Sequence, residues 1–412
     1  MFKPFQPPDL SDEPDASDQP NYRPTYFRPF RRDWVIAAAV LLAPWVLAED
    51  AAMNPEELGP YPIGVTTVLF EDHARVDEAT GKPRALLTEI WYPATDDARD
   101  LPKNKLSDFN MKGQNAQLNA ALKAVFNIDL AGNDKTFKNL AVRDARVRDG
   151  VFPLILFSHG NGGMRTQNTF LCDHLASHGY IVVSPDHTGN CCFTTVDNVM
   201  IPMNPAGRDQ AAADRPKDIS FLIDQMTRFN NGADSRFLGK LDLEHIGVTG
   251  HSFGGYTAAA VADTDTRVDA IAPIAAVGRT RTNYDMPVLA ILGTEDATIK
   301  EEGNTRIRQY YEESKGPHYL VEFKNAGHYS FTDMVKFNPT FGDGVGSGTR
   351  IGNGEALTYL DSATTYRLTN GYVMAFFGKY VKGLPGYDAY LGENHFPEEL
   401  IVKSSPGPIS TE

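Results

Sequence analysis

From residue 152 onward, the chain contains several short runs of uninterrupted apolar residues. A run of this kind is typical of a parallel strand that is buried on both faces, because a half-exposed strand alternates apolar and polar positions. The pattern predicts strands at Phe152 to Ser158, Tyr180 to Pro185, Ile246 to Gly250, Val268 to Ile274, Met286 to Leu292 and Tyr319 to Phe323.

The segments between these runs have the periodicity of amphipathic helices. The helix predicted at Arg215 to Phe229 has one apolar face, made of Ile219, Leu222, Ile223 and Met226. Strands that alternate with helices predict an α/β fold, with a mainly parallel, doubly wound sheet and helices on both faces. Further helices are predicted at Thr166 to Ser177, after Ser252, at Thr305 to Ser314 and from about Leu360 to Val381.

The part of the chain before residue 152 predicts a different organisation. Ile63 to Phe70 and Leu86 to Trp91 are rich in β-formers, and a charged turn separates them, so we expect an antiparallel hairpin at the edge of the sheet. Residues 96–149 are mostly polar, with one amphipathic segment at Asn115 to Phe126. We interpret them as an excursion that contains a helix.

The first 48 residues predict an export signal behind a disordered extension. Residues 1–30 are rich in Pro, Asp and Ser and have no periodicity. In residues 31–48, the pair Arg31-Arg32 precedes a short apolar run that ends at Ala48. This run is short for a roughly 30 Å hydrocarbon core, so we expect cleavage near Ala48 rather than a permanent anchor. A twin-arginine signal matches loosely and remains an alternative.

Composition limits the classes of partner. The 412 residues carry a formal net charge of −14, which argues against a nucleic-acid partner and predicts an acidic surface. The order of the motifs indicates a single catalytic domain at 58–398, followed by a flexible tail at 399–412. Three cysteines, Cys172, Cys191 and Cys192, do not make a disulfide framework, and both one bridge and none are compatible with them.

The sequence Gly250-His-Ser252-Phe-Gly254 predicts a sharp turn that presents a nucleophile. It follows a predicted strand and precedes an Ala-rich helix, as a nucleophile elbow requires. Glycines are needed because the backbone is strained there and a Cβ would collide across the turn. We therefore predict that Ser252 is the nucleophile, with Gly250 and Gly254 as supports of the elbow.

A serine hydroxyl needs a base, and the base needs a carboxylate to orient it. His328 lies in a loop just after a predicted strand, so we predict that it is the base. Asp296 follows the preceding strand and is the predicted acid, with Glu295 as the neighbouring alternative. We expect His174 and His178 to be packing or surface residues, and His187 and His251 to be neighbours of the site.

The same chemistry needs two N–H donors for the oxyanion. The backbone of Phe253, next to the nucleophile, is one candidate, and the backbone of Asn161 is the other. Asn161 belongs to the glycine-rich loop that starts at His159-Gly160, directly after a predicted strand. The loop lacks the spacing of a phosphate-binding motif. We expect no metal and no organic cofactor.

Four stretches of sequence together resemble one group of enzymes. They are Phe157 to Gly163, Leu175 to Val183, Gly250 to Gly255 and Gly327-His328. They look like the α/β-hydrolases of the platelet-activating factor acetylhydrolase (isoform II) and exported dienelactone-hydrolase-like group. The resemblance implies an α/β-hydrolase fold with Ser252 as nucleophile, His328 as base, and Phe253 and Asn161 as oxyanion donors.

The resemblance has two departures. The animal acetylhydrolases take their acid from the strand before the one that leads to Asp296, and this chain has no carboxylate at Pro273 to Ala276. Dienelactone hydrolases proper use cysteine where this chain has Ser252. The first departure weakens a transfer of phospholipid specificity, and the second argues against dienelactone hydrolysis.

The resulting hypothesis is an exported serine esterase that acts on a small-molecule or lipid ester. The connection after Ile274 is too short for a large lid, so we expect an open site and short-chain substrates. We expect the rim to come from the excursion before Phe152, from Gly189 to Gly207 and from Gly342 to Gly354. A cutinase-like polyesterase, an acyltransferase and a non-catalytic binding protein remain alternatives.

Overall fold

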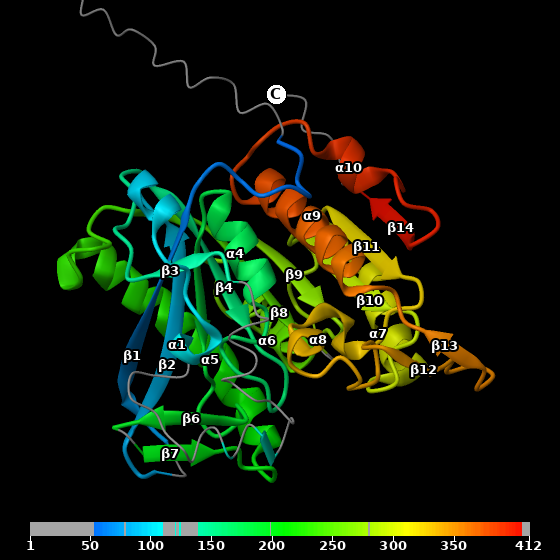
Figure 1. Ribbon diagram of the computed structural model, residues 1–412, viewed down its shortest axis with the longest axis horizontal. Coiled ribbons are helices and arrows are strands. Elements are labelled where there is room, and N and C mark those ends of the chain that lie inside the picture. The colour runs from blue at the N-terminus through cyan, green and yellow to red at the C-terminus, as the bar shows by residue number, and fades with distance from the viewer. Residues whose placement is uncertain are drawn as a thin grey trace, which may run out of the picture. The chain divides into compact units, whose positions relative to one another are not determined.

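A computed structural model of the chain describes residues 53–77, 80–109, 120, 123–124, 139–197, 199–278 and 281–405 (Figure 1). The predicted disordered extension, the export signal with its cleavage site, and most of the predicted helix at Asn115 to Phe126 lie outside these residues. Within them, no helix combines the length and the apolar character that crossing a membrane would need.

A ten-stranded sheet forms the centre of the described part, in the order β14-β11-β10-β9-β8-β4-β5-β2-β1-β3. Its middle strands, from β11 to β5, are parallel, whereas β2 and β14 pair antiparallel with their neighbours. The strands are β1 (Ile63–Val76), β2 (Pro83–Pro93), β3 (Ala141–Arg143), β4 (Phe152–Ser158), β5 (Ile181–Pro185), β8 (Leu241–His251), β9 (Ala270–Ile274), β10 (Val288–Gly293), β11 (His318–Phe323) and β14 (Leu400–Ser405).

Helices cover both faces of this sheet (Figure 1). One face packs on α4 (Thr169–Ser177) and α9 (Ser362–Tyr380), and the other on α5 (Arg208–Arg228), α6 (Phe253–Ala262) and α7 (Lys300–Glu312). Short elements make up the rest: η1 (Asp96–Asp100), α1 (Leu106–Phe109), the hairpin β6 (Phe193–Val196) and β7 (Val199–Pro202), η2 (Phe229–Ala233), η3 (His328–Phe331), α8 (Met334–Phe337), the hairpin β12 (Ser347–Thr349) and β13 (Ala356–Thr358), and α10 (Asp388–Gly392).

Strand β4 shows why its sequence has no polar alternation. Leu154 and Leu156 point into the core under α5 and α6, whereas Ile155 and Phe157 point into the core under α4 and α9. Every residue of the strand is buried, because both faces of the sheet are covered. The predicted mainly parallel, doubly wound sheet with helices on both faces is therefore confirmed.

Most predicted elements lie within a few residues of their expected positions, and the largest difference is in α5. This helix begins at Arg208, seven residues before the predicted Arg215, and it continues through Pro216. Its first two turns are polar and mostly exposed, so they have no apolar periodicity that would reveal them. The N-terminal turn of α5 reaches the functional site described below.

The predicted flexible tail from residue 399 is wrong for its first part. Leu400–Ser405 form β14, which pairs antiparallel with β11 along its whole length. A strand at this position forms hydrogen bonds with the backbone groups of β11 that are otherwise unpaired on that side. A strand with one exposed face and few apolar residues gives a weak sequence signal.

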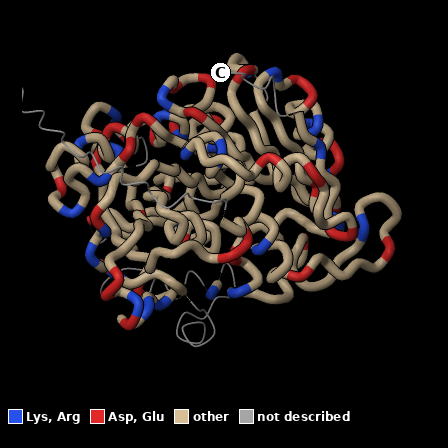
Figure 2. The backbone as a smooth tube through the Cα atoms, turned by 90° about the horizontal axis from the view of Figure 1, so that it is seen from above, with Lys and Arg blue, Asp and Glu red and all other residues tan. Residues whose placement is uncertain are grey.

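Charged residues of both signs lie mainly around the periphery of the described part, and its interior is largely uncharged (Figure 2). The connection from β9 to β10 contains no helix or strand in its described residues, 275–278 and 281–287. The absence of a large lid in this connection was predicted from its length.

Candidate active site

Ser252 lies at a strained turn between β8 and α6. Its φ of 55° and ψ of −120° are outside the regions that a serine normally adopts. A Cβ on Gly250 would lie 2.5 Å from the carbonyl oxygen of Ser158, and a Cβ on Gly254 would lie 1.7 Å from the same atom. Only glycine fits at these two positions, as the nucleophile-elbow interpretation requires.

The structure brings Ser252, His328 and Asp296 into one hydrogen-bonded chain. His328 Nε2 is 2.8 Å from Ser252 Oγ, and His328 Nδ1 is 2.7 Å from Asp296 Oδ2. Asp296 is fully buried and His328 nearly so, whereas Ser252 is only partly buried. The two partners are thus shielded from water, and the serine hydroxyl is accessible.

The backbone selects Asp296 rather than Glu295 as the partner of His328. Asp296 Oδ1 accepts the N–H groups of Thr298 and Ile299, which leaves Oδ2 to face the imidazole. Glu295 is turned away, and its carboxylate binds the Arg350 side chain and the backbone N–H of Ile351. Of the two acids left open by the sequence, only Asp296 contacts the histidine.

The two predicted oxyanion donors have free backbone N–H groups. Phe253 is the first residue of α6, so its N–H lies at the positive end of the helix dipole. Asn161 follows Gly160 in the turn after β4. Neither N–H has an acceptor among the described residues, and both residues line the cleft that contains Ser252. His159, in contrast, is fully buried below this loop.

Known proteins resemble this chain in sequence and structure. A family model described as platelet-activating factor acetylhydrolase, isoform II, matches residues 47–203, and one described as the dienelactone hydrolase family matches residues 144–337. Platelet-activating factor acetylhydrolase from Cavia porcellus is 24% identical over 300 residues, which are 63% of this chain and 66% of that protein. The enzyme of the same name from Bos taurus is 25% identical over 158 residues, 31% of this chain and 36% of that protein.

A solved structure is similar to this chain in fold. A ferulic acid esterase from Streptomyces cinnamoneus has a TM-score of 0.65 and 25% identity, covering 84% of this chain and 96% of its own. The chain spans just under two thirds of the Cavia porcellus relative and about a third of the Bos taurus relative. The chain has the α/β-hydrolase fold, and it is similar to proteins of this acetylhydrolase and dienelactone-hydrolase-like group.

Ser252 of this α/β-hydrolase opens into a cleft of about 1370 Å³. Its walls come from the loop after β4, the first turns of α5 and α6, the N-terminal part of α7, and α8. Aromatic side chains and charged side chains of both signs line it, including Phe253, Tyr256, Tyr329, Arg208 and Glu302. The cleft is therefore broad, and both polar and apolar side chains line it.

The predicted rim is wrong for the segments that the structure describes. No residue of Gly189 to Gly207 or of Gly342 to Gly354 lines the cleft, and neither do the described residues of the excursion before Phe152. The first two segments instead bind the backbone of loops that line the cleft. Asn190 O accepts the N–H of Gly162, next to Asn161 in the oxyanion loop.

Asp343 is a supporting residue that the sequence did not reveal. Its Oδ1 accepts the backbone N–H groups of His328 and Ala297, and its Oδ2 accepts the hydroxyl of Thr298 at 2.5 Å. One carboxylate therefore joins the loop of the base to the loop of the acid. No local motif marks Asp343, because it lies 15 residues after His328 and acts only through the fold.

His251 and Gln167 connect the loop of Gly160 and Asn161 to His328. Burial lowers the pKa of His251 well below its usual value, so its ring is neutral. Its Nε2–H donates to the carbonyl of His328, and its Nδ1 accepts from Gln167 Nε2. Gln167 Oε1 accepts the N–H of Gly160. His251 was expected near the site, whereas Gln167 was missed.

The other expected histidines have structural partners. His174 Nε2 lies 2.8 Å from the carbonyl of Pro55, and His178 Nε2 lies 2.8 Å from that of Glu57. His187 belongs to a second Ser-His-Asp arrangement, with Nε2 2.9 Å from Ser158 Oγ and Nδ1 2.9 Å from Asp218 Oδ2. All three of its side chains are fully buried, so no substrate reaches them.

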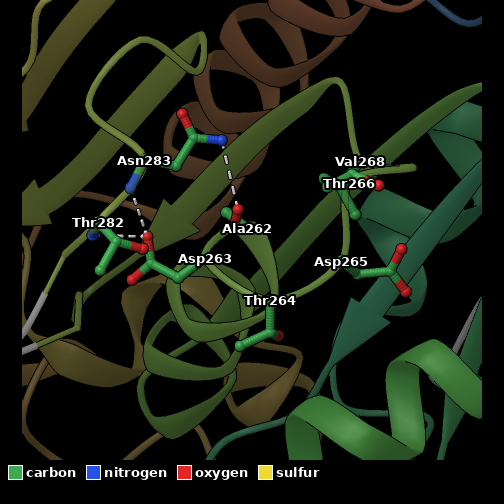
Figure 3. A pocket seen from close by; sticks show the side chains of 8 residues that line it. All are labelled: Ala262, Asp263, Thr264, Asp265, Thr266, Val268, Thr282 and Asn283. Atoms are coloured by element: carbon green, nitrogen blue, oxygen red, sulfur yellow. Dashed lines mark hydrogen bonds between the residues drawn. The ribbon is translucent and has the colours of Figure 1, made fainter.

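A smaller hollow of about 360 Å³ lies at the C-terminal end of α6 (Figure 3). Asp263 closes one side of it by accepting the N–H groups of Thr282 and Asn283. None of the candidate catalytic residues lines this hollow. Across the described part of the chain, no cluster of three or more His, Cys, Asp or Glu side chains has the geometry of a metal site, and the three cysteines are unpaired.

Proposed function

We propose that the chain is a serine carboxylic-ester hydrolase that works through an acyl-enzyme. One observation carries this proposal: the hydrogen-bonded chain Ser252–His328–Asp296 opens into a cleft lined by Phe253 and Asn161, whose N–H groups have no acceptor among the described residues. A nucleophile, a base, an orienting acid and an oxyanion site are the parts that acyl transfer needs. The names of the relatives, acetylhydrolase and esterase, support the same reaction class.

In the proposed reaction, Ser252 Oγ attacks the ester carbonyl while His328 Nε2 takes its proton. Asp296 holds the imidazole in the tautomer with hydrogen on Nδ1 and stabilises the imidazolium that forms. The N–H groups of Phe253 and Asn161 receive the negative charge that develops on the carbonyl oxygen. His328 then protonates the departing alcohol. In the second half of the reaction, His328 takes a proton from water, which attacks the acyl-enzyme, and then returns the proton to Ser252 as the acid leaves.

We propose short-chain esters as the substrates, including acetyl esters of phospholipid-like alcohols. The open cleft supports this choice, since its volume of about 1370 Å³ exceeds the roughly 300–1,000 Å³ of most ligand pockets. A bulky alcohol therefore has room beside a small acyl group. The same room favours a polyester chain, so a cutinase-like activity is the second candidate.

An ester panel tests the acyl specificity. We expect hydrolysis of p-nitrophenyl esters of about C2 to C6, with no jump in rate at the solubility limit, because the described residues between β9 and β10 form no lid for a lipid surface to open. Initial rates across acetate to palmitate, measured below and above that limit, give the answer. A sharp rise at the limit together with a preference for C12 or longer chains contradicts this expectation.

Two further substrates separate the candidates. Turnover of a short-chain phospholipid without release of acid from a polyester film supports the acetylhydrolase-like activity, and the opposite result supports the polyesterase. A fluorophosphonate probe distinguishes both from a non-catalytic binding protein, because only an activated serine reacts with it. An acyltransferase is recognised by ester formation when a competing alcohol is added.

We also propose that the enzyme is exported and that residues 58–405 form one catalytic domain. Basic residues before a short apolar run that ends at Ala48 support cleavage there. We expect the mature protein, recovered from the periplasm or medium of its host, to lack residues 1–48. Mass spectrometry of its N-terminus measures this. An N-terminus before Trp34, found in membrane fractions, contradicts cleavage and indicates an anchor.

A further inference from the structure

Arg215 is a fully buried guanidinium directly below the oxyanion loop. It lies on the face of α5 that packs against the sheet, and no carboxylate forms a salt bridge with it among the described residues. Instead, its Nη1 donates to the carbonyl of His159 at 2.6 Å and its Nη2 to the carbonyl of Gly160 at 3.1 Å. The negative charge of Asp218 offsets part of the cost of burying this cation, but its hydrogen-bond acceptors are neutral, so its position requires an explanation.

The carbonyl of Gly160 belongs to the same peptide unit as the N–H of Asn161. It also accepts from the backbone N–H of Gly163 at 3.1 Å and from His159, whose protonation is fixed by its surroundings. The backbone N–H of His187 donates to His159 Nε2 at 3.1 Å, so the ring hydrogen lies on Nδ1, which is 2.6 Å from Gly160 O. Burial lowers the pKa of His159 well below its usual value and keeps the ring neutral.

Three donors on one carbonyl, from Arg215, His159 and the Gly163 N–H, both orient and polarise the peptide. The Gly160 N–H is also fixed, by Gln167, so the plane of the next peptide, which carries the Asn161 N–H, has little freedom. Hydrogen bonds to a peptide oxygen strengthen the N–H of the same peptide as a donor, because the two groups polarise each other. Asn161 lines the cleft, and its N–H has no acceptor among the described residues.

The same guanidinium contacts the residue that carries the second donor. Arg215 Cζ lies 4.7 Å from the centroid of the Phe253 ring, within the range of a cation–π contact. This contact, together with Arg208 at 5.7 Å, holds the ring of Phe253 at the start of α6. Phe253 lines the cleft, and its N–H has no acceptor among the described residues. One buried positive charge therefore lies behind both N–H groups.

We propose that Arg215 is a positioning residue that sets the oxyanion hole, by fixing the Gly160–Asn161 peptide and the Phe253 side chain together. This inference rests on the proposed esterase function. Burial lowers the pKa of Arg215 to about 9, so the side chain still carries its charge at neutral pH. Its positive charge favours the negative charge that develops on the substrate oxygen.

The test uses Arg215→Met, which keeps an unbranched apolar stem and removes the donors and the charge. We expect kcat to fall about 10- to 100-fold with KM within about threefold, because the oxyanion exists only in the transition state. A trifluoromethyl ketone inhibitor forms a hemiketal with Ser252 whose former carbonyl oxygen is an oxyanion. The affinity for this inhibitor should fall in parallel with kcat/KM. Arg215→Lys should recover part of the loss, since it restores a charge and one donor.

Arg281→Met is the matched control. Arg281 is also a buried arginine that donates to backbone carbonyls, those of Asn283 and Tyr310, and stacks on a tyrosine ring, but none of these residues lines the cleft. If Arg281→Met lowers kcat as much as Arg215→Met, the effect is general loss of stability and the proposal is wrong. The proposal is also wrong if Arg215→Met changes only KM.

Two results separate this inference from the proposed function. Suppose that the parent is active, that its Ser252→Ala variant is inactive, and that the Arg215→Met variant is folded, fully active and as sensitive to the ketone as the parent. This result rejects the role of Arg215 alone. A parent that neither hydrolyses esters nor reacts with a fluorophosphonate rejects the proposed function itself. If Arg215→Met does not fold, the Arg215→Lys comparison still decides, because a positioning role requires its kcat and its ketone affinity to fall together.

Discussion

Ser252→Ala should lower kcat by roughly 10⁶-fold, because the members of a catalytic triad act as a unit and no other hydroxyl takes over the attack. The structure supports this size of effect. Ser252 Oγ is 2.8 Å from His328 Nε2, and the only comparable serine arrangement among the described residues is fully buried. The measurement is kcat on p-nitrophenyl acetate, together with labelling by a fluorophosphonate, which the variant should lose.

Ser158→Ala is the matched control for this variant. Ser158 has its own His187 and Asp218 at hydrogen-bonding distances, but it lies inside the protein. We expect at most a few-fold loss of kcat and unchanged labelling. Residual activity of Ser252→Ala within tenfold of the parent, with circular dichroism showing both variants folded, would show that Ser252 is not the nucleophile.

Asp296→Asn should lower kcat on the order of 10⁴-fold while the fold stays intact. An amide can donate to His328 Nδ1 and so stabilise the tautomer whose Nε2 carries the hydrogen and cannot accept the serine proton. The amide also cannot stabilise the imidazolium. The measurement is kcat of the purified variant against the parent, with the melting temperature as a check on folding.

Glu295→Gln, at the neighbouring residue, is the matched control for Asp296→Asn. This carboxylate binds Arg350 and the N–H of Ile351 and does not contact His328. A partly exposed ion pair of this kind contributes little to stability, so we expect activity within a few-fold of the parent. A large loss in Glu295→Gln with little loss in Asp296→Asn would mean that the acid is misassigned.

The sequence predicts the parts of the fold and site that depend on local patterns. Continuous apolar runs predicted the central strands, because a strand covered on both faces needs no polar positions. Ser252 and its glycines were predictable because a strained turn restricts the residue types around it. His328 and Asp296 lie just after predicted strands, and parallel strands bring their carboxyl ends to one edge of the sheet.

The features that the sequence did not reveal depend on contacts between distant segments. Asp343, Gln167 and Arg215 act through backbone groups of other loops, and a hydrogen bond to a backbone group leaves no trace in the identity of its partner. The acid remained open between two neighbouring carboxylates because their directions are set by the turn after β10. The predicted rim was wrong for its described residues, because the first turns of α5 line the cleft and their sequence has no apolar periodicity.

The glycines of the elbow also limit how this enzyme can be made more heat-resistant. Exchange of glycine for alanine at a compatible site commonly adds about 0.4–1 kcal/mol, by reducing the freedom of the denatured chain. Gly250 and Gly254 do not allow it, since a methyl group would collide with the backbone of Ser158. Gly352 has open space around it and no positive φ, so protein engineering for thermostability should begin on that loop and leave the strained turn alone.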